Sequence, residues 1–354
     1  MEKIKLTRTT NPRPRPNQDD LPFGKYFSDH MFLLDYDAGM GWHDARIIPY
    51  GPFTLEPSCM VFHYAQEIFE GLKAYRDPQG AVRLFRPIEN VWRMNRSAAR
   101  MGIPQVPEDI ALAGIHELVT LDADWVPSSP DTSLYIRPFI FATEPSLGVH
   151  ASKSYYYCII TSPVGSYYPN GIDPVKILIE EEDVRAVRGG TGMVKCGGNY
   201  AASIRASSRA EDEGYTQVLW LDGVERRYIE EVGSMNIMFK IAGEVITPAL
   251  TGSVLPGITR KSCIELMEAW GLVVTERPIT IDELLVAADD GTLEEVWGTG
   301  TAAVVSPVGE ITYGGKTYVV NGGGIGPLTR RLYDELTGIQ WGKTDDPFGW
   351  SIVL

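Results

Sequence analysis

The sequence predicts a protein of two domains, each containing both strands and helices. Three observations support this fold class. At 354 residues, the chain is too long for one ordinary hydrophobic core. Short apolar runs of strand type alternate with longer runs of helical periodicity. A stretch rich in proline and glycine, residues 162–174, interrupts this pattern near the middle of the chain. We therefore expect four parts: an N-terminal arm at 1–20, a small domain at 21–163, a linker at 164–174 and a large domain at 175–354.

Composition excludes several classes of function. Hydrophobic residues make up 44% of the chain and charged residues 22%, which is typical of a globular protein. The formal net charge of −14 argues against nucleic acid or an anionic membrane as a partner. The sequence contains no run of 18 apolar residues, so no membrane span is predicted. The polar N-terminus lacks the apolar stretch of a secretory signal.

The cysteines show no spacing typical of metal ligands, so no metal site is expected. We interpret them as free thiols of a cytoplasmic protein, which the reducing environment of that compartment favours. They are Cys59, Cys158, Cys196 and Cys263.

The first half of the chain is predicted to be mixed α+β. Pro12, Pro14 and Pro16 predict a flexible arm before it. Short apolar runs between turn signals predict strands at 31–35, 61–64, 82–85, 134–142 and 155–161. Apolar residues at helical spacing predict helices at 90–101, which ends before Gly102, and at 108–121.

The second half is also predicted to combine strands and helices. Strands are expected at 175–179, 217–221, 235–241, 244–247 and 294–297. Helices are expected at 200–213, 260–270 and 328–336, the first two of which end before Gly214 and Gly271.

The most informative motif is the segment MVKCGGNY at residues 193–200. Lys195 follows an apolar pair and precedes two glycines, which let backbone approach a flat ligand. Apolar shielding disfavours the ammonium form and lowers the pKa of the amine. A neutral amine attacks carbonyls and forms Schiff bases, as a pyridoxal phosphate (PLP) enzyme requires of its lysine. Tyr200, five residues on, can donate its hydroxyl to the phenolic oxygen of PLP.

PLP also needs an acid that keeps its pyridine nitrogen protonated, so that the ring can accept electrons. Glu230 and Glu231 stand just before Gly233 and a predicted strand, where a carboxylate can approach a ligand closely. Their charges alone do not separate the two candidates.

Two segments can bind the phosphate of PLP. In LPGITR, residues 255–260, a turn opens a helix whose free amides attract anions. In GTGTAA, residues 298–303, a glycine-threonine turn follows a strand. The second segment also fits a dinucleotide-binding motif, which requires a helix directly after the glycines. Pro307 prevents that helix, and no acid lies near residues 318–320, so we reject this alternative.

The first half supplies further candidates for binding. Tyr64 can line an apolar pocket and donate one hydrogen bond. Arg93, on a predicted helix, can pair with a phosphate. Arg137 lies within an otherwise apolar strand, where a buried charge requires an anion, so we interpret it as a ligand of a substrate carboxylate.

Taken together, these segments resemble the branched-chain amino acid aminotransferases, which are fold-type IV PLP enzymes of the D-amino acid aminotransferase type. The resemblance extends from about Phe23 to the C-terminus. It is carried by the stretches PFGKYFSDHM, HYAQEIFEGLKAY, LFRPIENVWRMNRSA, SLYIRPFIFATEPSLGV, SPVGSYYPNG, KCGGNYAAS, QVLWLDG, EEVGSMN, LPGITR and GTGTAAVVSPV.

The resemblance implies a role for each matching residue, with PLP bound between the two domains. Lys195 would carry the cofactor and move the proton between the substrate Cα and C4′ of PLP. Glu231 would face the pyridine nitrogen, and Tyr200 the phenolate. The phosphate would be bound by Arg93, Ile258, Thr259 and Thr301. The substrate would contact Phe23, Tyr64, Tyr135, Arg137, Val149, Tyr167, Ser234, Thr301 and Ala302. Among these, Arg137 would bind the distal carboxylate of glutamate, and Val149 would reach the site of a neighbouring subunit.

The activity implied is transamination of leucine, isoleucine and valine with 2-oxoglutarate by a homodimer whose sites lie near the subunit interface. Some family members carry a Cys-x-x-Cys pair after the last phosphate turn, but Ala303 and Ser306 stand there in this chain. Three alternatives share some of these features: a D-amino acid aminotransferase, an aminodeoxychorismate lyase and a binding protein without catalysis. The aromatic residues and Arg137 favour the branched-chain enzyme over the first two, and Lys195 argues against the third.

Overall fold

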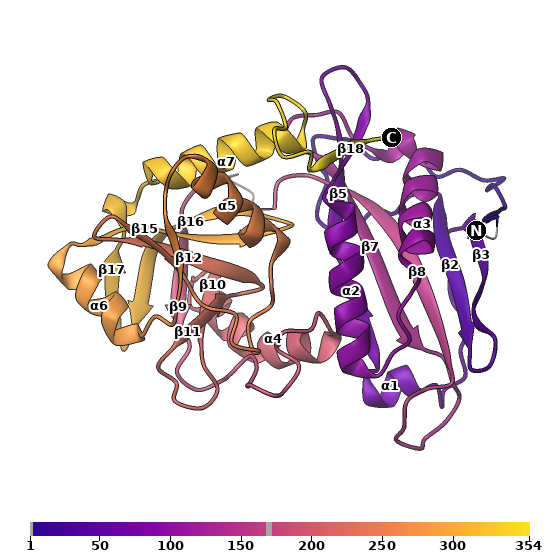
Figure 1. The fold of residues 1–354 in the computed structure, drawn as a ribbon, viewed down its shortest axis with the longest axis horizontal. Helices are drawn as coiled ribbons and strands as arrows, with labels where there is room; N and C mark the ends of the chain where they lie inside the picture. The colour runs from indigo at the N-terminus through magenta and orange to yellow at the C-terminus, as the bar shows by residue number, and fades with distance from the viewer. Residues whose placement is uncertain (1–2, 168–171) are drawn as a thin grey trace. The chain divides into compact units, whose positions relative to one another are not determined.

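The computed structural model describes residues 3–167 and 172–354, and they form two compact units (Figure 1). The first unit holds the chain up to Tyr167 together with Val194–Gly197 and Gly338–Leu354. The second holds the remaining described residues, from 172 to Met193 and Gly198–Thr337. Both units contain strands and helices, which confirms the predicted fold class. The domain boundaries expected near 163 and 175 stay a prediction, but the segment around Lys195 belongs to the first unit.

The first unit is a sheet with helices packed on it. Its strands are β1 (Lys5–Leu6), β2 (His30–Asp37), β3 (Gly41–Pro49), β4 (Glu67–Phe69), β5 (Leu72–Arg76), β6 (Val82–Phe85), β7 (Ser133–Ala142), β8 (Ser154–Val164) and β18 (Ser351–Val353). Its helices are α1 (Met60–Tyr64), α2 (Pro87–Met101), α3 (Glu108–Leu121) and the short 3-10 helix Ala123–Trp125. The strands follow the order β1-β3-β2-β8-β7-β5-β6-β18, and β4 also pairs with β7.

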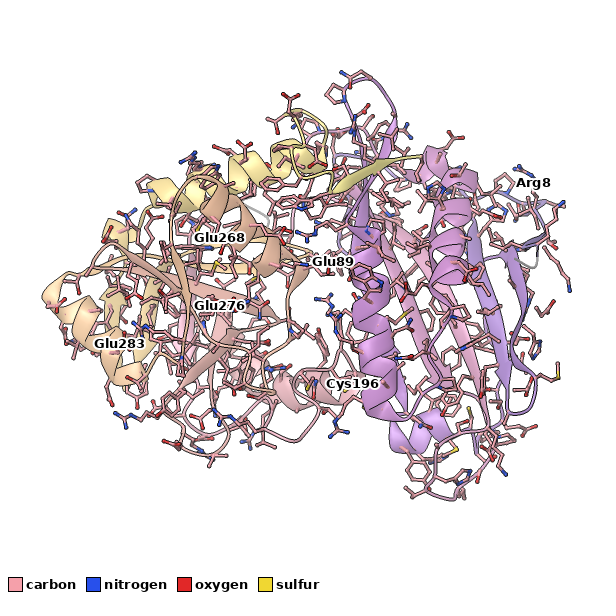
Figure 2. The ribbon with its side chains drawn as sticks, in the orientation of Figure 1. Arg8, Glu89, Cys196, Glu268, Glu276 and Glu283 are labelled. Carbon is pink, nitrogen blue, oxygen red and sulfur yellow. The ribbon has the colours of Figure 1, made fainter. Side chains whose placement is uncertain are left out.

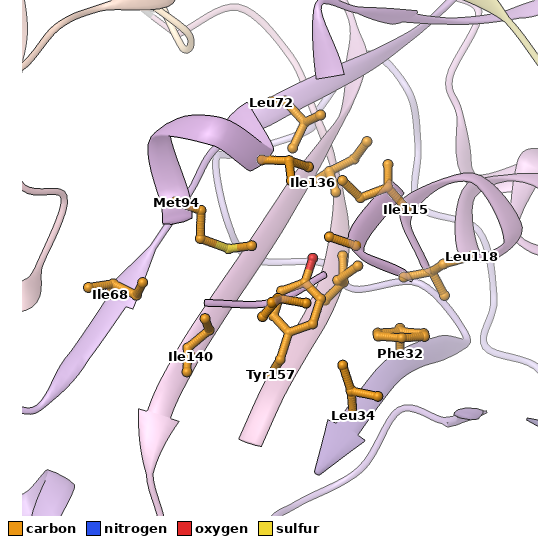
Figure 3. Packing of buried hydrophobic residues seen from close by; sticks show 14 of the residues in the cluster. Phe32, Leu34, Ile68, Leu72, Met94, Ile115, Leu118, Ile136, Ile140 and Tyr157 are labelled. Carbon is orange, nitrogen blue, oxygen red and sulfur yellow. The ribbon is translucent and has the colours of Figure 1, made fainter. Parts of the chain in front are cut away.

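Helices α2 and α3 cover one face of this sheet. Helix α2 begins with Pro87, whose missing N–H is harmless in a first turn, and ends at Gly102 in the left-handed conformation. Its apolar stripe and that of α3 pack on the inward side chains of the strands, as Figure 3 shows for Met94, Ile115 and Leu118. This burial of apolar surface provides the main stabilisation of the unit.

The opposite face of the sheet carries a different set of side chains. Along β7, Leu134, Ile136 and Ile140 enter the core beneath the helices. Because successive side chains of a strand point to opposite faces, Tyr135 and Arg137 lie on the other side. This face therefore presents a tyrosine and an arginine in the middle of the sheet.

The second unit is built around a closed ring of strands. Its strands are β9 (Val175–Ile179), β10 (Gln217–Leu221), β11 (Ile229–Val232), β12 (Met235–Ile241), β13 (Glu244–Thr247), β14 (Val274–Glu276), β15 (Leu293–Gly300), β16 (Val304–Tyr313) and β17 (Lys316–Val319). Its helices are α4 (Gly197–Asp212), α5 (Ile258–Ala269), α6 (Ile281–Asp290), α7 (Pro327–Gln340), whose last turn belongs to the first unit, and the short 3-10 helix Asn321–Gly323. The order β11-β10-β9-β16-β15-β12 returns to β11, because β11 and β12 also pair.

Two expectations from the sequence need correction. The strand expected at 61–64 is wrong, because these residues belong to helix α1, which ends at Ala65 in the left-handed conformation. A short apolar run does not distinguish a strand from one helical turn by its periodicity. The described part of the N-terminal segment is also held rather than free. Strand β1 pairs with β3, and the Arg13 N–H donates to the carboxylate of Asp29 (2.7 Å).

The structure also bears on the cysteines and on membrane spans. All four cysteines are buried free thiols, and burial raises the pKa of Cys263 to about 12. Among the described helices, none combines the length and the apolar character needed to cross a membrane.

Candidate active site

Lys195 lies in the short segment between a turn at 191–193 and helix α4, and two elements of the first unit hold this segment in place. The Lys195 N–H donates to Ser97 Oγ on α2 (3.3 Å), and its carbonyl accepts from the Phe69 N–H on β4 (2.9 Å). Its neighbours Val194 and Cys196, the latter marked in Figure 2, are buried in the core of the unit. The chain is therefore anchored to the first unit on both sides of Lys195.

The amine of Lys195 is partly buried and has a lowered pKa. Its Nζ lies 4.7 Å from the centre of the Phe69 ring. Burial is the main cause that lowers the pKa to about 8, and the charge of Arg93 adds to it. Glu70 and Tyr135 oppose this shift. Lys195 therefore carries a larger neutral fraction near pH 7 than an ordinary lysine does, as the sequence predicts.

Arg93 and Glu70 form a buried ion pair with two hydrogen bonds. Arg93 Nε donates to one carboxylate oxygen of Glu70 (2.7 Å) and Nη2 to the other (2.8 Å). Asn90 Nδ2 adds a third bond to the same carboxylate (2.8 Å). Burial alone would raise the pKa of Glu70, but these donors lower it overall. The pair fixes the guanidinium in orientation, which sequence reasoning about Arg93 missed.

Aromatic rings surround Arg137 on the face of the sheet opposite the helices. Its guanidinium carbon lies 4.6 Å from the centre of the Phe69 ring and 5.3 Å from that of Tyr135. Arg137 Nη2 donates to the Tyr135 hydroxyl (3.1 Å), whereas its buried Nε has no hydrogen-bond partner among the described residues. Phe23 packs edge-on against Tyr135 and Tyr167, with ring centres 4.9 and 6.1 Å away. The structure thus brings together four residues predicted to contact substrate, and adds Phe69.

Tyr64 lies against the loop that carries Val149. The hydroxyl of Tyr64 donates to the carbonyl of Leu147, on the loop that follows β7. Leu147 and Val149 on this loop are 65% and 83% exposed. The exposure of two apolar side chains in one loop is typical of a surface that contacts another molecule.

Glu231 lies in a row of polar residues across three strands of the second unit. It pairs with Asn236 on β12, which in turn pairs with Thr299 on β15, so all three side chains share one face. The Glu231 carboxylate accepts from the Leu255 N–H (2.7 Å) and forms an ion pair with Arg185 Nε (3.1 Å). Helix α4, which carries the partly buried Tyr200, covers this face near Trp220 through Ala206 and Ala210.

Glu230 has a different environment, although it is equally buried. The register between β10 and β11 passes from Ile229 directly to Glu231, so Glu230 is left out of the ladder. One of its oxygens accepts from Ser253 Oγ, and the other has no hydrogen-bond partner in the described part of the chain. Burial is the main cause that raises the pKa of Glu230. The ladder therefore separates two acids that the sequence alone leaves equivalent.

The two phosphate candidates are both backbone turns of the second unit. Helix α5 begins at Ile258 after Gly257, and neither Ile258 nor Thr259 can bond within the helix through its N–H. A side chain at Gly257 would overlap the Asn236 amide, so this turn lies directly against the Glu231 row. Thr301 and Ala302 form the tight connection between β15 and β16, and Ser234 is exposed in the turn between β11 and β12. Thr299 Oγ1, at the end of the row, is buried without a hydrogen-bond partner among the described residues.

The chain is similar to a known family of enzymes. The model of the family "Amino-transferase class IV" matches residues 67–311. A "Branched-chain-amino-acid aminotransferase 2" of Bacillus subtilis (strain 168) is 56% identical over 349 residues, covering 99% of this chain and 96% of its own. A "Branched-chain-amino-acid aminotransferase" of Mycobacterium tuberculosis is 47% identical over 358 residues, covering 99% and 97%.

A solved structure gives the same result for the fold. The branched-chain amino acid aminotransferase of Escherichia coli aligns with a TM-score of 0.73 and 25% identity, over 92% of this chain and 98% of its own.

The chain therefore belongs to the class IV amino-transferases, within the group of branched-chain amino acid aminotransferases, and is an enzyme that transfers an amino group.

Proposed function

We propose that this enzyme uses PLP to exchange an amino group between leucine, isoleucine or valine and 2-oxoglutarate, giving the branched-chain 2-keto acids and glutamate. One observation carries the proposal most directly: Lys195, whose pKa is lowered to about 8, lies beside the same aromatic ring as Arg137. The Nε of Arg137 has no hydrogen-bond partner within the described part of the chain. A neutral amine suits the cofactor chemistry, and an aromatic wall that includes one cation suits both apolar and carboxylate side chains.

The groups available for PLP fit the demands of that cofactor. Lys195 supplies the amine, and Glu231 supplies an acid whose position is set by Arg185 and by the Leu255 N–H. The free N–H groups of Ile258 and Thr259 suit a phosphate, as do Arg93 and Thr301, and Tyr200 suits the phenolic oxygen. PLP, when bound, draws electrons from the substrate α-carbon and so weakens its C–H bond. Solved relatives support this choice, since the Thermobaculum terrenum enzyme is described in its PLP form.

The residues of the chain are proposed to have three roles: proton transfer, orientation of the α-carboxylate and binding of the side chain. Lys195 Nζ removes the proton from the substrate α-carbon, which its lowered pKa permits near neutral pH. The amides of Thr301 and Ala302 orient the α-carboxylate. The side-chain pocket is proposed to consist of Phe23, Tyr64, Tyr135, Arg137, Tyr167 and Ser234. Apolar rings favour a leucine side chain by removing it from water, and Arg137 binds the distal carboxylate of glutamate.

We also propose that the enzyme acts as a homodimer. The support is the loop with Leu147 and Val149, whose exposed apolar side chains suit burial against a second copy. In that assembly Val149 would contribute to the site of the neighbouring subunit.

The lowered pKa of Lys195 predicts how the incorporation of PLP depends on pH. With a pKa of about 8, the neutral fraction of the amine rises about tenfold per pH unit below 8 and levels off above it. The rate of covalent PLP incorporation into cofactor-free protein should follow this curve. Stopped-flow visible absorbance between pH 6.5 and 10 measures it. A rate that keeps rising to pH 10 would show instead that Lys195 titrates as an ordinary lysine.

The dual-substrate proposal is tested by Arg137→Met, which keeps length and apolar packing but removes the charge. The half-reaction with glutamate should lose roughly 2–5 kcal/mol of transition-state binding, as expected when a buried carboxylate loses its partner. The half-reaction with leucine should change far less, because its side chain needs no cation. Stopped-flow measurement of each half-reaction separately decides the matter.

Arg96→Met is the matched control, because Arg96 is an exposed arginine of α2 and no role is assigned to it. It should leave both half-reactions unchanged. If Arg137→Met slows the leucine and glutamate half-reactions equally, Arg137 is structural and the proposed basis for accepting both substrates is wrong.

A further inference from the structure

The face of β4 that carries Phe69 also carries an acid that the proposed mechanism does not use. Glu67 and Phe69 are two residues apart on this strand, so their side chains share one side of the sheet. The ladder pairs Phe69 with Phe139 on β7, and Arg137 lies two residues further along β7 on the same side. A carboxylate, an aromatic ring and a guanidinium therefore follow one another across neighbouring strands.

Glu67 is bonded to the segment that presents Lys195. Its carboxylate accepts a hydrogen bond from the Gly197 N–H, two residues after the lysine. The Lys195 carbonyl is bonded at the same strand, to the Phe69 N–H (2.9 Å). A side chain at Gly197 would overlap the Glu67 carboxylate in its present position, so glycine lets the carboxylate approach the backbone closely. Glu67 thus combines a positional contact with a charge close to the proposed substrate wall.

The charges of Glu67 and Arg137 influence each other. Burial is the main cause that raises the pKa of the Glu67 carboxyl, and the positive charge of Arg137 opposes this shift. Arg137 in turn has an Nε without a hydrogen-bond partner among the described residues, and no carboxylate within 4 Å of it is found there. A guanidinium against aromatic rings needs a compensating charge, and Glu67 supplies it from a distance.

We infer that Glu67 is a positioning residue that sets the preference of the Arg137 site between apolar and carboxylate side chains. When an aliphatic side chain occupies the pocket, the negative charge of Glu67 compensates Arg137. When the distal carboxylate of glutamate binds Arg137, that carboxylate competes with Glu67 for the same cation. Glu67 therefore weakens the binding of dicarboxylates and favours branched-chain substrates. The inference rests on the proposed function and adds to it a determinant of specificity.

Glu67→Gln tests the charge alone, because the amide oxygen still accepts from the Gly197 N–H. In the holoenzyme, calorimetry should show glutarate, an unreactive dicarboxylate, binding about tenfold more tightly than to the unmodified enzyme, as one removed charge predicts. Binding of 4-methylpentanoate, an unreactive aliphatic monocarboxylate, should weaken or stay the same. The ratio of kcat/KM for glutamate to that for leucine should rise in parallel, chiefly through KM.

Three comparisons separate this role from a structural one. Glu67→Ala removes the bond to Gly197 as well, so kcat should fall with both substrates, unlike in Glu67→Gln. Glu117→Gln, which removes an exposed acid of α3, should change neither ligand. In an Arg137→Met background, Glu67→Gln should no longer alter the binding of glutarate, because the two residues act through one charge pair.

The inference is overturned if Glu67→Gln leaves the ratio of glutarate to 4-methylpentanoate affinities unchanged or lowers it. It is also overturned if the effect persists without Arg137. Failure of the proposed function gives a different result, since the unmodified holoenzyme would then transaminate neither leucine nor glutamate.

Discussion

The variant Lys195→Ala should lose transamination of leucine and of glutamate by about 10³- to 10⁴-fold, since a positioned general base contributes about 10² to 10⁴ in rate and the covalent link to PLP is lost as well. The hydrogen bonds of Lys195 with Ser97 and Phe69 use only the backbone atoms of Lys195, so alanine preserves them. The variant should therefore fold normally while failing to show the visible absorbance of covalently bound PLP.

Two measurements make this result specific. Borohydride reduction followed by peptide mapping should place the pyridoxyl label on Lys195 in the unmodified enzyme. Lys343→Ala, which changes an exposed lysine of the first unit, should keep both label and activity. A label on Lys73, a buried lysine whose pKa burial also lowers to about 8, would assign the role to that residue instead. Full turnover in Lys195→Ala would likewise show that Lys195 is not the residue that binds PLP covalently.

The second large effect is expected from Glu231→Gln, which should lower the rate about 10²- to 10³-fold while PLP stays bound. An amide cannot keep the pyridine nitrogen protonated, and the Arg185 ion pair loses its negative partner. The amide oxygen can still accept from the Leu255 N–H, so the local fold should persist. Single-turnover kinetics and the PLP content of the purified variant are the measurements.

Glu230→Gln is the matched control, because the two acids are adjacent and equally buried. Its amide oxygen can keep the bond from Ser253, and its carboxyl, with a pKa raised by burial, already resists ionisation. The rate should therefore change less than about threefold, the scale of a few tenths of a kcal/mol. If Glu230→Gln lowers the rate more than Glu231→Gln does, Glu230 rather than Glu231 faces the pyridine nitrogen.

Much of the fold could be predicted from the sequence because its elements carry clear periodicity. Helix α3 spans the predicted residues 108–121, with acids in its first turn and an apolar stripe toward the core. Strand β9 likewise spans 175–179. The residues of α1 carried no such signal, since five residues are too few to show a period. Helix α6 (Ile281–Asp290) was not predicted, although Thr280 caps it through the Glu283 N–H, a signal the sequence contains.

The residues of the candidate site were predictable where one short segment of the sequence contains both the reactive group and its surroundings. Lys195 stands out because its neighbours are apolar on one side and glycine on the other. Glu70 and Glu67 did not stand out, because their partners Arg93 and Gly197 are 23 and 130 residues away in the sequence. Such pairings depend on the tertiary fold, which a local pattern does not contain. The same holds for Glu230 and Glu231, whose difference is created by the register of β11 against β10.

The membership of Val194–Gly197 in the first unit has a consequence for protein engineering. A chimaera that joins the N-terminal part of this enzyme to the C-terminal part of a relative at residue 175 would bring a foreign lysine segment. The residues of that segment would have to pack in the core of the first unit where Val194 and Cys196 lie. Its lysine would also have to form the backbone hydrogen bonds with Ser97 and Phe69. Recombination libraries should therefore place their crossover after Gly197, or transplant residues 194–197 together with α2 and β4. The lysine segment is supported by the first unit, although it follows the linker in the chain.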